Sequence, residues 1–123
     1  MTSKEILLAE DNPVNTMVAR KILESFGVAV IHAKNGLEAI NIANSKKFDM
    51  IFLDIQMPEI DGMEATVEIR SSKCFNQQTP IIAMTANAMI GDREKYLSVG
   101  MDEYISKPIS KHAVIKVLEQ FLD

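Results

Sequence analysis

Five short apolar segments alternate with longer stretches of helical periodicity along this chain. The apolar segments are residues 6–9, 28–33, 50–53, 81–84 and 104–106. Each is short enough to be one buried strand, and each stretch between them is long enough to hold a helix. Because strands this apolar must be buried on both faces, the pattern predicts an α/β fold: a parallel sheet with helices on both sides and right-handed crossovers.

Helix start and stop signals support this alternation. Asn12-Pro13 starts a first helix that Gly27 stops, and Asn35 starts a second helix. The larger apolar side chains of the first helix fall on one side at helical spacing: Val14, Met17, Val18, Ile22 and Phe26. Three further helices are predicted, over residues 62–70, over residues 92–98 and after Ser110. Five βα units result, for which we expect the flavodoxin-like strand order 2-1-3-4-5.

Length and composition limit the class of protein. The chain has 123 residues, the size of one domain, and we expect residues 1–123 to form a single domain. Cys74 is the only cysteine, which excludes an internal disulfide and suits a reducing cytoplasm. The formal net charge of -4 argues against direct binding of nucleic acid. No apolar run approaches the ~18 residues of a membrane span, so we expect a soluble, cytoplasmic protein without membrane insertion.

Polar side chains follow four of the five predicted strands. Glu10 and Asp11 come after the first strand, Asp54 after the third, Thr85 after the fourth and Lys107 close to the end of the fifth. In an open parallel sheet, ligands bind beyond the carboxyl ends of the strands, near a switch point in strand order. The predicted order brings these four strand ends together, so the sequence predicts one site there.

The residue types indicate phosphoryl chemistry. Three carboxylates in one cleft repel each other unless a cation or a proton relieves them. Mg²⁺ prefers few carboxylates together with water and phosphate oxygens, so we expect Mg²⁺, with Mn²⁺ as a substitute. Asp54 is then the candidate nucleophile, Lys107 the candidate cation and Thr85 a hydroxyl donor. Each residue alone also fits a structural role, such as a turn cap or a surface charge, and their joint placement favours the site.

The chain resembles a response-regulator receiver domain over essentially its whole length. The similar segments are ILLAEDNPVN, DMIFLDIQMPEIDG, MTANA and GMDEYISKP. This resemblance implies that Asp54 is the phosphoacceptor and Asp11 a direct magnesium ligand. It also implies that Glu10 is a ligand acting mainly through water and that the backbone carbonyl of Gln56 is a further ligand.

The same resemblance implies roles for the residues around the phosphoryl group. Thr85 and Lys107 bind it, and Thr85 with Tyr104 forms a conformational switch in which the aromatic ring swings inward. The alternative for Tyr104 is simple packing at the end of the sheet. Gln56 and Asn87 tune hydrolysis of the phosphoryl group.

The segments around these residues look most like receivers of hybrid sensor kinases, whose partner is a histidine kinase or a histidine phosphotransfer domain. The resemblance places partner docking on the first helix and an active-site loop, at Val14, Asn15, Val18 and Pro108. The alternative for the two valines is burial against the sheet. The resemblance favours a cis Lys107–Pro108 bond, which the sequence alone leaves open. It also leaves open weak dimerisation, and whether the chain is a stand-alone regulator.

Two other functions stay open at this point. One is a pseudo-receiver, an interaction module that keeps the fold without the phosphorylation cycle. The other is a metal-dependent phosphohydrolase, against which Gln56 counts, because one such family has a second aspartate two positions after its nucleophile. The leading hypothesis is a receiver that catalyses its own phosphorylation without turning over an external substrate.

Overall fold

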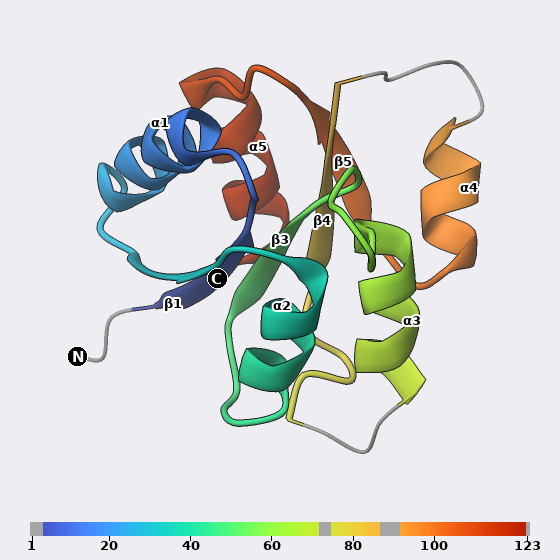
Figure 1. The fold of residues 1–123 in the computed structure, drawn as a ribbon. Helices are drawn as coiled ribbons and strands as arrows, with labels where there is room; N and C mark the ends of the chain where they lie inside the picture. The colour runs from blue at the N-terminus through green and yellow to red at the C-terminus, as the bar shows by residue number, and fades with distance from the viewer. Residues whose placement is uncertain (1–3, 72–74, 87–91, 123) are drawn as a thin grey trace.

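The computed structural model describes residues 4–71, 75–86 and 92–122. Five parallel strands form one sheet in the order β2-β1-β3-β4-β5, which confirms the predicted fold class (Figure 1). The strands are β1 (Glu5–Ala9), β2 (Ala29–Ala33), β3 (Met50–Asp54), β4 (Ile81–Thr85) and β5 (Glu103–Ser106). The helices are α1 (Pro13–Glu24), α2 (Gly36–Ala43), α3 (Gly62–Ser71), α4 (Asp92–Ser98) and α5 (Lys111–Phe121).

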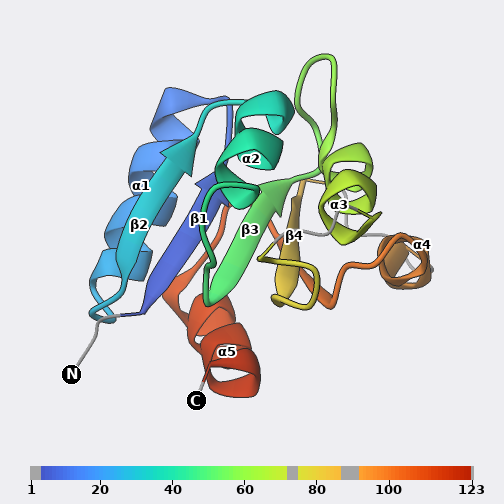
Figure 2. The same cartoon turned by 90° about the horizontal axis from the view of Figure 1, so that it is seen from below.

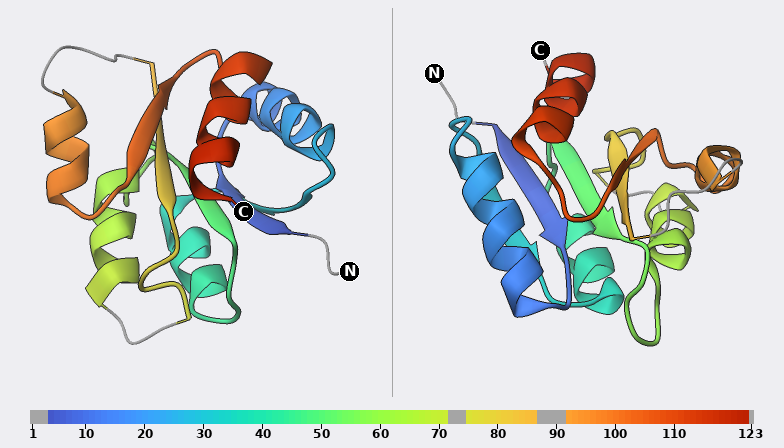
Figure 3. Two further views of the ribbon diagram at one scale, coloured as in Figure 1. Left: turned by 180° about the vertical axis from the view of Figure 1, so that it is seen from behind. Right: turned by 90° about the horizontal axis from the view of Figure 1, so that it is seen from above.

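The helices cover both faces of the sheet. Helices α1 and α5 lie on one face, while α2, α3 and α4 lie on the other (Figures 2 and 3). Alternate strand residues enter the two cores: Phe52 of β3 packs with α1 and α5, and its neighbour Leu53 packs on the opposite side. Because both faces are covered, the central strands are apolar at nearly every position, as the sequence pattern requires.

The predicted helix starts are confirmed. The Asn12 side chain accepts hydrogen bonds from the backbone N–H groups of residues 14 and 15, and Pro13 is the first residue of α1. Asn35 caps α2 by accepting a bond from residue 38, and Ser110 caps α5 by accepting one from residue 113. These three caps fix where each helix begins after the strand before it.

The predicted apolar side of α1 is only partly the side that meets the sheet. The buried residues of α1 are Ala19 and Leu23, which lie on a different side of the helix from Val14 and Val18. Val14 is 62% exposed and Val18 38% exposed, so burial of these two valines against the sheet is wrong. The helix contacts the sheet through its small Ala19, which leaves an apolar surface beside the carboxyl ends of the strands.

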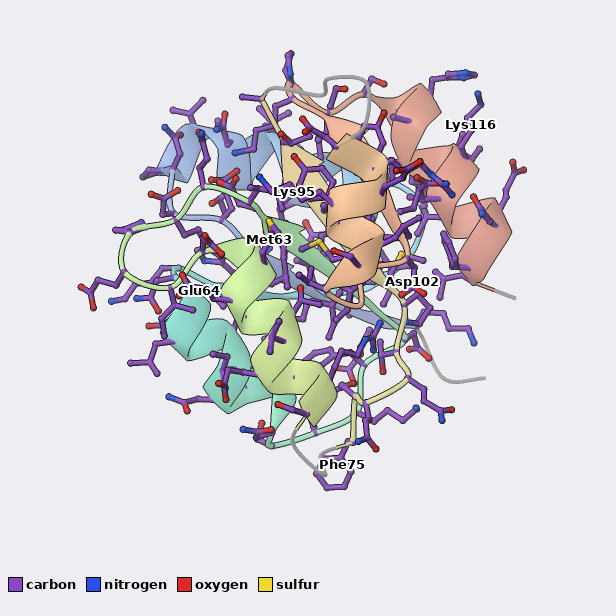
Figure 4. All side chains as sticks on the ribbon, turned by 90° about the vertical axis from the view of Figure 1, so that its right-hand side faces the viewer. Met63, Glu64, Phe75, Lys95, Asp102 and Lys116 are labelled. Carbon is purple, nitrogen blue, oxygen red and sulfur yellow. The ribbon has the colours of Figure 1, made fainter. Side chains whose placement is uncertain are left out.

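An ion pair at the other end of the sheet holds β5 in place. The carboxylate of Asp102 accepts hydrogen bonds from Arg70 Nη2 at 2.9 Å and from the backbone N–H of Ile81 at 2.8 Å. Figure 4 labels Asp102 close to the lower end of α4. These contacts join α3, β4 and the turn that enters β5, so they set the register of the strand that leads to Lys107.

Across the parts of the chain that the structure describes, no helix is both long and apolar enough to cross a membrane.

Candidate functional site

A buried ion cluster lies where the carboxyl ends of β1, β3 and β5 meet. Lys107 Nζ is 2.7 Å from Asp54 Oδ2 and 2.9 Å from Glu10 Oε1. Asp54 and Glu10 are each 2% exposed, and the Lys107 side chain is 17% exposed. Three strand ends thus bring one ammonium between two carboxylates, as the strand order predicts. The cluster of these three side chains carries a net negative charge when both acids are ionised.

Backbone contacts fix both ends of the ion pair between Asp54 and Lys107. Asp54 Oδ1 accepts a hydrogen bond from the backbone N–H of Gln56 at 3.0 Å. The backbone N–H of Lys107 donates to the carbonyl of Thr85 at 2.8 Å, which ties the loop after β5 to the end of β4. The peptide bond that follows, Lys107–Pro108, is cis. The nucleophile candidate is therefore held by bonds to both of its oxygens.

Three acidic side chains could hold a metal ion. Glu10, Asp11 and Asp54 each offer a carboxylate oxygen, and these oxygens all lie within 4.8 Å of one another. Asp11 is exposed while the other two are buried, so the cluster opens to solvent on one side. Hard oxygen ligands with an open side suit Mg²⁺, which keeps several of its waters. The donor set therefore fits the predicted ion.

The cluster changes the proton affinity of Glu10 and Lys107. Burial, followed by a hydrogen bond with Asp54, raises the pKa of Glu10 from 4.5 to about 7, although Lys107 and the N–H of Asn12 pull it down. Burial alone would lower the pKa of Lys107, but hydrogen bonds to Asp54 and Glu10 raise it above its ordinary value. Without a metal, a proton partly relieves the repulsion between the two acids.

Glu10 should give the metal-free protein a distinctive pH-dependent stability. Between its unfolded pKa of 4.5 and its folded pKa of about 7, the folded state binds a proton that the unfolded chain has released. The free energy of unfolding should therefore fall as pH rises through this window, by on the order of 3 kcal/mol at most from this group. Denaturant unfolding of wild type and Glu10→Gln at about pH 5 and about pH 7 in chelator measures it. Identical pH slopes in the two proteins would contradict this assignment.

Thr85 is buried at the end of β4 and contacts a residue that the sequence analysis missed. The Tyr96 hydroxyl donates a hydrogen bond to Thr85 Oγ1 at 3.3 Å. The Tyr96 ring also meets the ring of Tyr104 edge to face, with centroids 5.9 Å apart. The available signal was a single aromatic residue, followed by one leucine, in the mostly polar segment DREKYLS, which could have marked the inward side of this helix.

His32 is a second residue near the site without a predicted role there. Its Nε2 lies 2.9 Å from the carbonyl oxygen of Glu10 and 3.3 Å from Thr16 Oγ1. The end of β2 therefore helps to fix the backbone that carries Glu10. No sequence motif indicates this contact, because it depends on β2 pairing beside β1.

The remaining predicted residues lie around the rim of the site. The Gln56 side chain is exposed beside Asp54, and Asn87 lies outside the described residues. Asn15, Val18 and Pro108 line a small pocket next to Glu10 and Lys107. Val14 lies exposed on the same helix. The predicted docking residues that the structure describes therefore sit next to the ion cluster.

The sequence matches the family described as response regulator receiver domain over residues 6–119. It is 38% identical to probable histidine kinase 1 of Oryza sativa subsp. indica over 96% of this chain, and it spans 15% of that protein. It is also 38% identical to the polar-differentiation response regulator DivK of Brucella anthropi, covering 97% of this chain and 96% of DivK. The chain thus matches a small part of one relative and nearly all of another.

Solved structures share the fold. The receiver domain of sensor histidine kinase PA1611 from Pseudomonas aeruginosa, with a magnesium ion coordinated in its active-site cleft, is 40% identical with a TM-score of 0.88 and 98% coverage of both chains. The receiver domain of Ssk1 from Saccharomyces cerevisiae, co-crystallised with the histidine phosphotransfer protein Ypd1, is 30% identical with a TM-score of 0.86. That match covers 97% of this chain and 88% of the other.

Proposed function

We propose, since this chain belongs to the response regulator receiver domain family, that it accepts a phosphoryl group from a phosphohistidine onto Asp54 and changes conformation in response. The observation that carries this proposal is the buried Asp54 carboxylate, bonded to Lys107 and to the N–H of Gln56 beside two further acids. Residues 1–123 form the receiver unit in this proposal, and its location is the cytoplasm.

A magnesium ion is the proposed cofactor, with Mn²⁺ as a substitute. Glu10, Asp11, Asp54 and the backbone carbonyl of Gln56 would hold it, and the magnesium in the PA1611 receiver supports this choice. When bound, the ion supplies positive charge that offsets the acids and the oxygens of the incoming phosphoryl group. Because Glu10 and Asp54 are buried, bulk water screens their attraction to the ion less than it would at the surface.

The protein's own side chains account for the transfer. An oxygen of Asp54 forms the new bond to phosphorus as the bond between phosphorus and the donor histidine nitrogen breaks, and the histidine keeps the electron pair. Lys107 then exchanges its bond to Asp54 for one to a phosphoryl oxygen, which its flexible stem permits. Thr85 donates its hydroxyl to another phosphoryl oxygen. By the pattern of the family, the side chains of Gln56 and Asn87 tune the rate at which water removes the phosphoryl group.

Thr85 and Tyr104 form the proposed switch. Thr85 moves toward the phosphoryl group, and the Tyr104 ring turns inward in response. The half-buried position of Tyr104 on β5, against the ring of Tyr96, supports a side chain with two available environments. A shift from 1:99 to 99:1 needs about 5.5 kcal/mol of differential interaction, so the phosphoryl group must be sensed by several bonds.

A histidine kinase or a histidine phosphotransfer domain is the proposed phosphodonor. The Ssk1 receiver is found with Ypd1, which is such a phosphotransfer protein. On this chain, Asn15, Val18 and Pro108 line a pocket with Lys107, and Val14 is exposed on the same helix as Val18. The exposed apolar side chains among them suit an apolar helix that carries the phosphohistidine. The 38% exposure of Val18 supports docking over a purely internal role.

Changing Asn15 tests this surface. Asn15→Lys places a long charged side chain at the pocket beside Lys107, and it should slow transfer from a phosphotransfer domain by about 10-fold or more, because a desolvated charge opposes docking. Phosphorylation by a small acyl-phosphate donor should stay near the wild-type rate. The two rates are compared under the same magnesium concentration. Equal slowing with both donors would show that Asn15 acts on the site itself rather than on docking.

Intact mass spectrometry tests the function directly. The protein is incubated with Mg²⁺ and a small acyl-phosphate donor, with and without chelator, and then with a phosphohistidine donor. We expect the mass of one phosphoryl group to appear only when the metal is present. Failure with both donors would favour the pseudo-receiver, and steady release of inorganic phosphate from unrelated phosphate esters would favour the phosphohydrolase.

A further inference from the structure

Tyr96 connects helix α4 to the phosphoryl site. Within α4, which the structure describes completely, it is the only buried side chain, with 5% exposure. Its ring packs in the core formed by α2, α3 and α4, and its hydroxyl donates to Thr85 Oγ1 at 3.3 Å. The one buried side chain of this mostly polar helix thus reaches the threonine that the proposed function uses.

The alternation of strand residues puts Thr85 and Asp54 on opposite faces of the sheet. Two residues before Thr85, Ala83 packs in the core that contains Tyr96. Two residues before Asp54, Phe52 packs in the core on the side of α1 and α5. Because side chains alternate along a strand, the hydroxyl of Thr85 leaves β4 toward α4, and the carboxylate of Asp54 leaves β3 toward the other face. The contact with Tyr96 fits this direction for Thr85.

A phosphoryl group on Asp54 therefore competes with Tyr96 for Thr85. A hydroxyl can donate one hydrogen bond and accept others at the same time, so Thr85 has enough donor and acceptor capacity for both partners. The Thr85 oxygen lies on the α4 side of the sheet, however, so a movement that turns it toward the Asp54 side takes it away from Tyr96. Movement of that oxygen away from α4 breaks the bond to Tyr96.

We infer that Tyr96 is a positioning residue whose hydroxyl holds Thr85 on the α4 side of the sheet in the unphosphorylated protein and thereby slows phosphorylation of Asp54. The inference rests on the proposed function and adds to it a restraint separate from the switch residue Tyr104. When the bond between Tyr96 and Thr85 breaks, α4 loses this contact with β4, so movement of Thr85 also affects α4. The edge-to-face contact between Tyr96 and Tyr104 joins this restraint to the switch.

The restraint is a modest one. A bond of 3.3 Å between two hydroxyl oxygens is longer than the usual ~2.7–2.8 Å, so its contribution belongs to the lower part of the range for neutral hydrogen bonds. Tyr96→Phe removes the hydroxyl and keeps the ring in the core. We expect this variant to be phosphorylated roughly 2- to 5-fold faster than wild type.

Rates of phosphoryl addition from a small acyl-phosphate donor test the inference, with four proteins compared at one magnesium concentration. They are wild type, Tyr96→Phe, Thr85→Val and the double variant. Thr85→Val should slow the reaction, and adding Tyr96→Phe to it should bring no acceleration, since the restrained hydroxyl is already gone. Far-ultraviolet circular dichroism checks that each protein is folded. Tyr96 as a mere packing residue would leave the rate unchanged or lower it, and any effect would persist in the Thr85→Val background.

The outcomes separate this inference from the proposed function. A phosphorylated wild type with a Tyr96→Phe variant that reacts no faster would overturn the inference alone. Equal acceleration in both Thr85 backgrounds would also overturn it, because the effect would not pass through Thr85. A wild type that no donor phosphorylates would overturn the proposed function, and the restraint would then have no reaction to control.

Discussion

Asp54→Asn protein is expected to gain no phosphoryl group from any donor, at any magnesium concentration. Asparagine has nearly the same shape, and its side-chain oxygen can still accept the hydrogen bond from the Gln56 N–H. It lacks the anionic oxygen that forms the bond to phosphorus, so the loss is chemical rather than structural. Intact mass spectrometry after incubation with a small acyl-phosphate donor measures the result.

The same substitution should change the neighbouring acid. Burial is the main cause of the raised Glu10 pKa, and the hydrogen bond and charge of Asp54 raise it further. Removing the Asp54 charge should therefore bring the pKa of Glu10 down while leaving it above the ordinary value, which NMR titration of the carboxyl carbon would follow. An unchanged Glu10 pKa would contradict the shared site.

Asp61→Asn is the matched control for this loss. It removes the same charge from the loop that follows Asp54, and the Asp61 side chain caps α3 by accepting a hydrogen bond from residue 64, a role that asparagine also fills. Its phosphorylation should equal that of wild type. A phosphoryl group on Asp54→Asn protein would show that another residue is the acceptor.

Gly62→Ala should strongly destabilise the junction between the loop after β3 and helix α3. An added Cβ at Gly62 would overlap the carbonyl oxygen of Asp54 and lie 3.0 Å from its carbonyl carbon and 3.1 Å from Ile55 Cα. Those are backbone atoms of the strand end, so relief requires the start of α3 to move away from β3. We expect the free energy of unfolding to fall by about 3 kcal/mol or more, at the upper end of the usual cost of overpacking. Denaturant unfolding measures it.

Gly27→Ala is the control for this change. Gly27 has a φ of +83° and no atom within 4 Å of an added Cβ, so its substitution strains only the backbone, at about 1 kcal/mol. At Gly62, an alanine in the first turn of a helix would ordinarily be favourable. A large loss of unfolding free energy there would therefore indicate the contact with Asp54. If Gly62→Ala were as stable as wild type, the close approach of α3 to Asp54 would be wrong.

The sequence places Gly62 at the start of a predicted helix, after a loop, and the structure adds a stronger constraint. The glycine is the first residue of α3, where it lets the helix approach the backbone of the candidate phosphoacceptor. Sequence reasoning recognises a glycine in a turn by its neighbours. It cannot recognise a close approach between two chain segments, because the second segment is located only by the tertiary fold.

The sequence by itself determined the order of the elements and the chemistry of the site. Apolar runs, Asn12-Pro13, Asn35 and Ser110 were sufficient to predict where strands and helices lie, since capping and burial act over a few neighbouring residues. The acids, the threonine and the lysine at strand ends predicted one site, because parallel strands end at the same edge. These are local signals combined with one rule of topology.

Only the tertiary structure decided which side chains meet and how their charges adjust. The face of α1 that contacts the sheet runs through Ala19 and Leu23 rather than through Val18, which is 38% exposed. The pKa of Glu10 rises because burial and Asp54 act together on it. The bond between Tyr96 and Thr85 joins α4 to β4. Each of these depends on distances between elements remote in sequence, which local propensity does not encode.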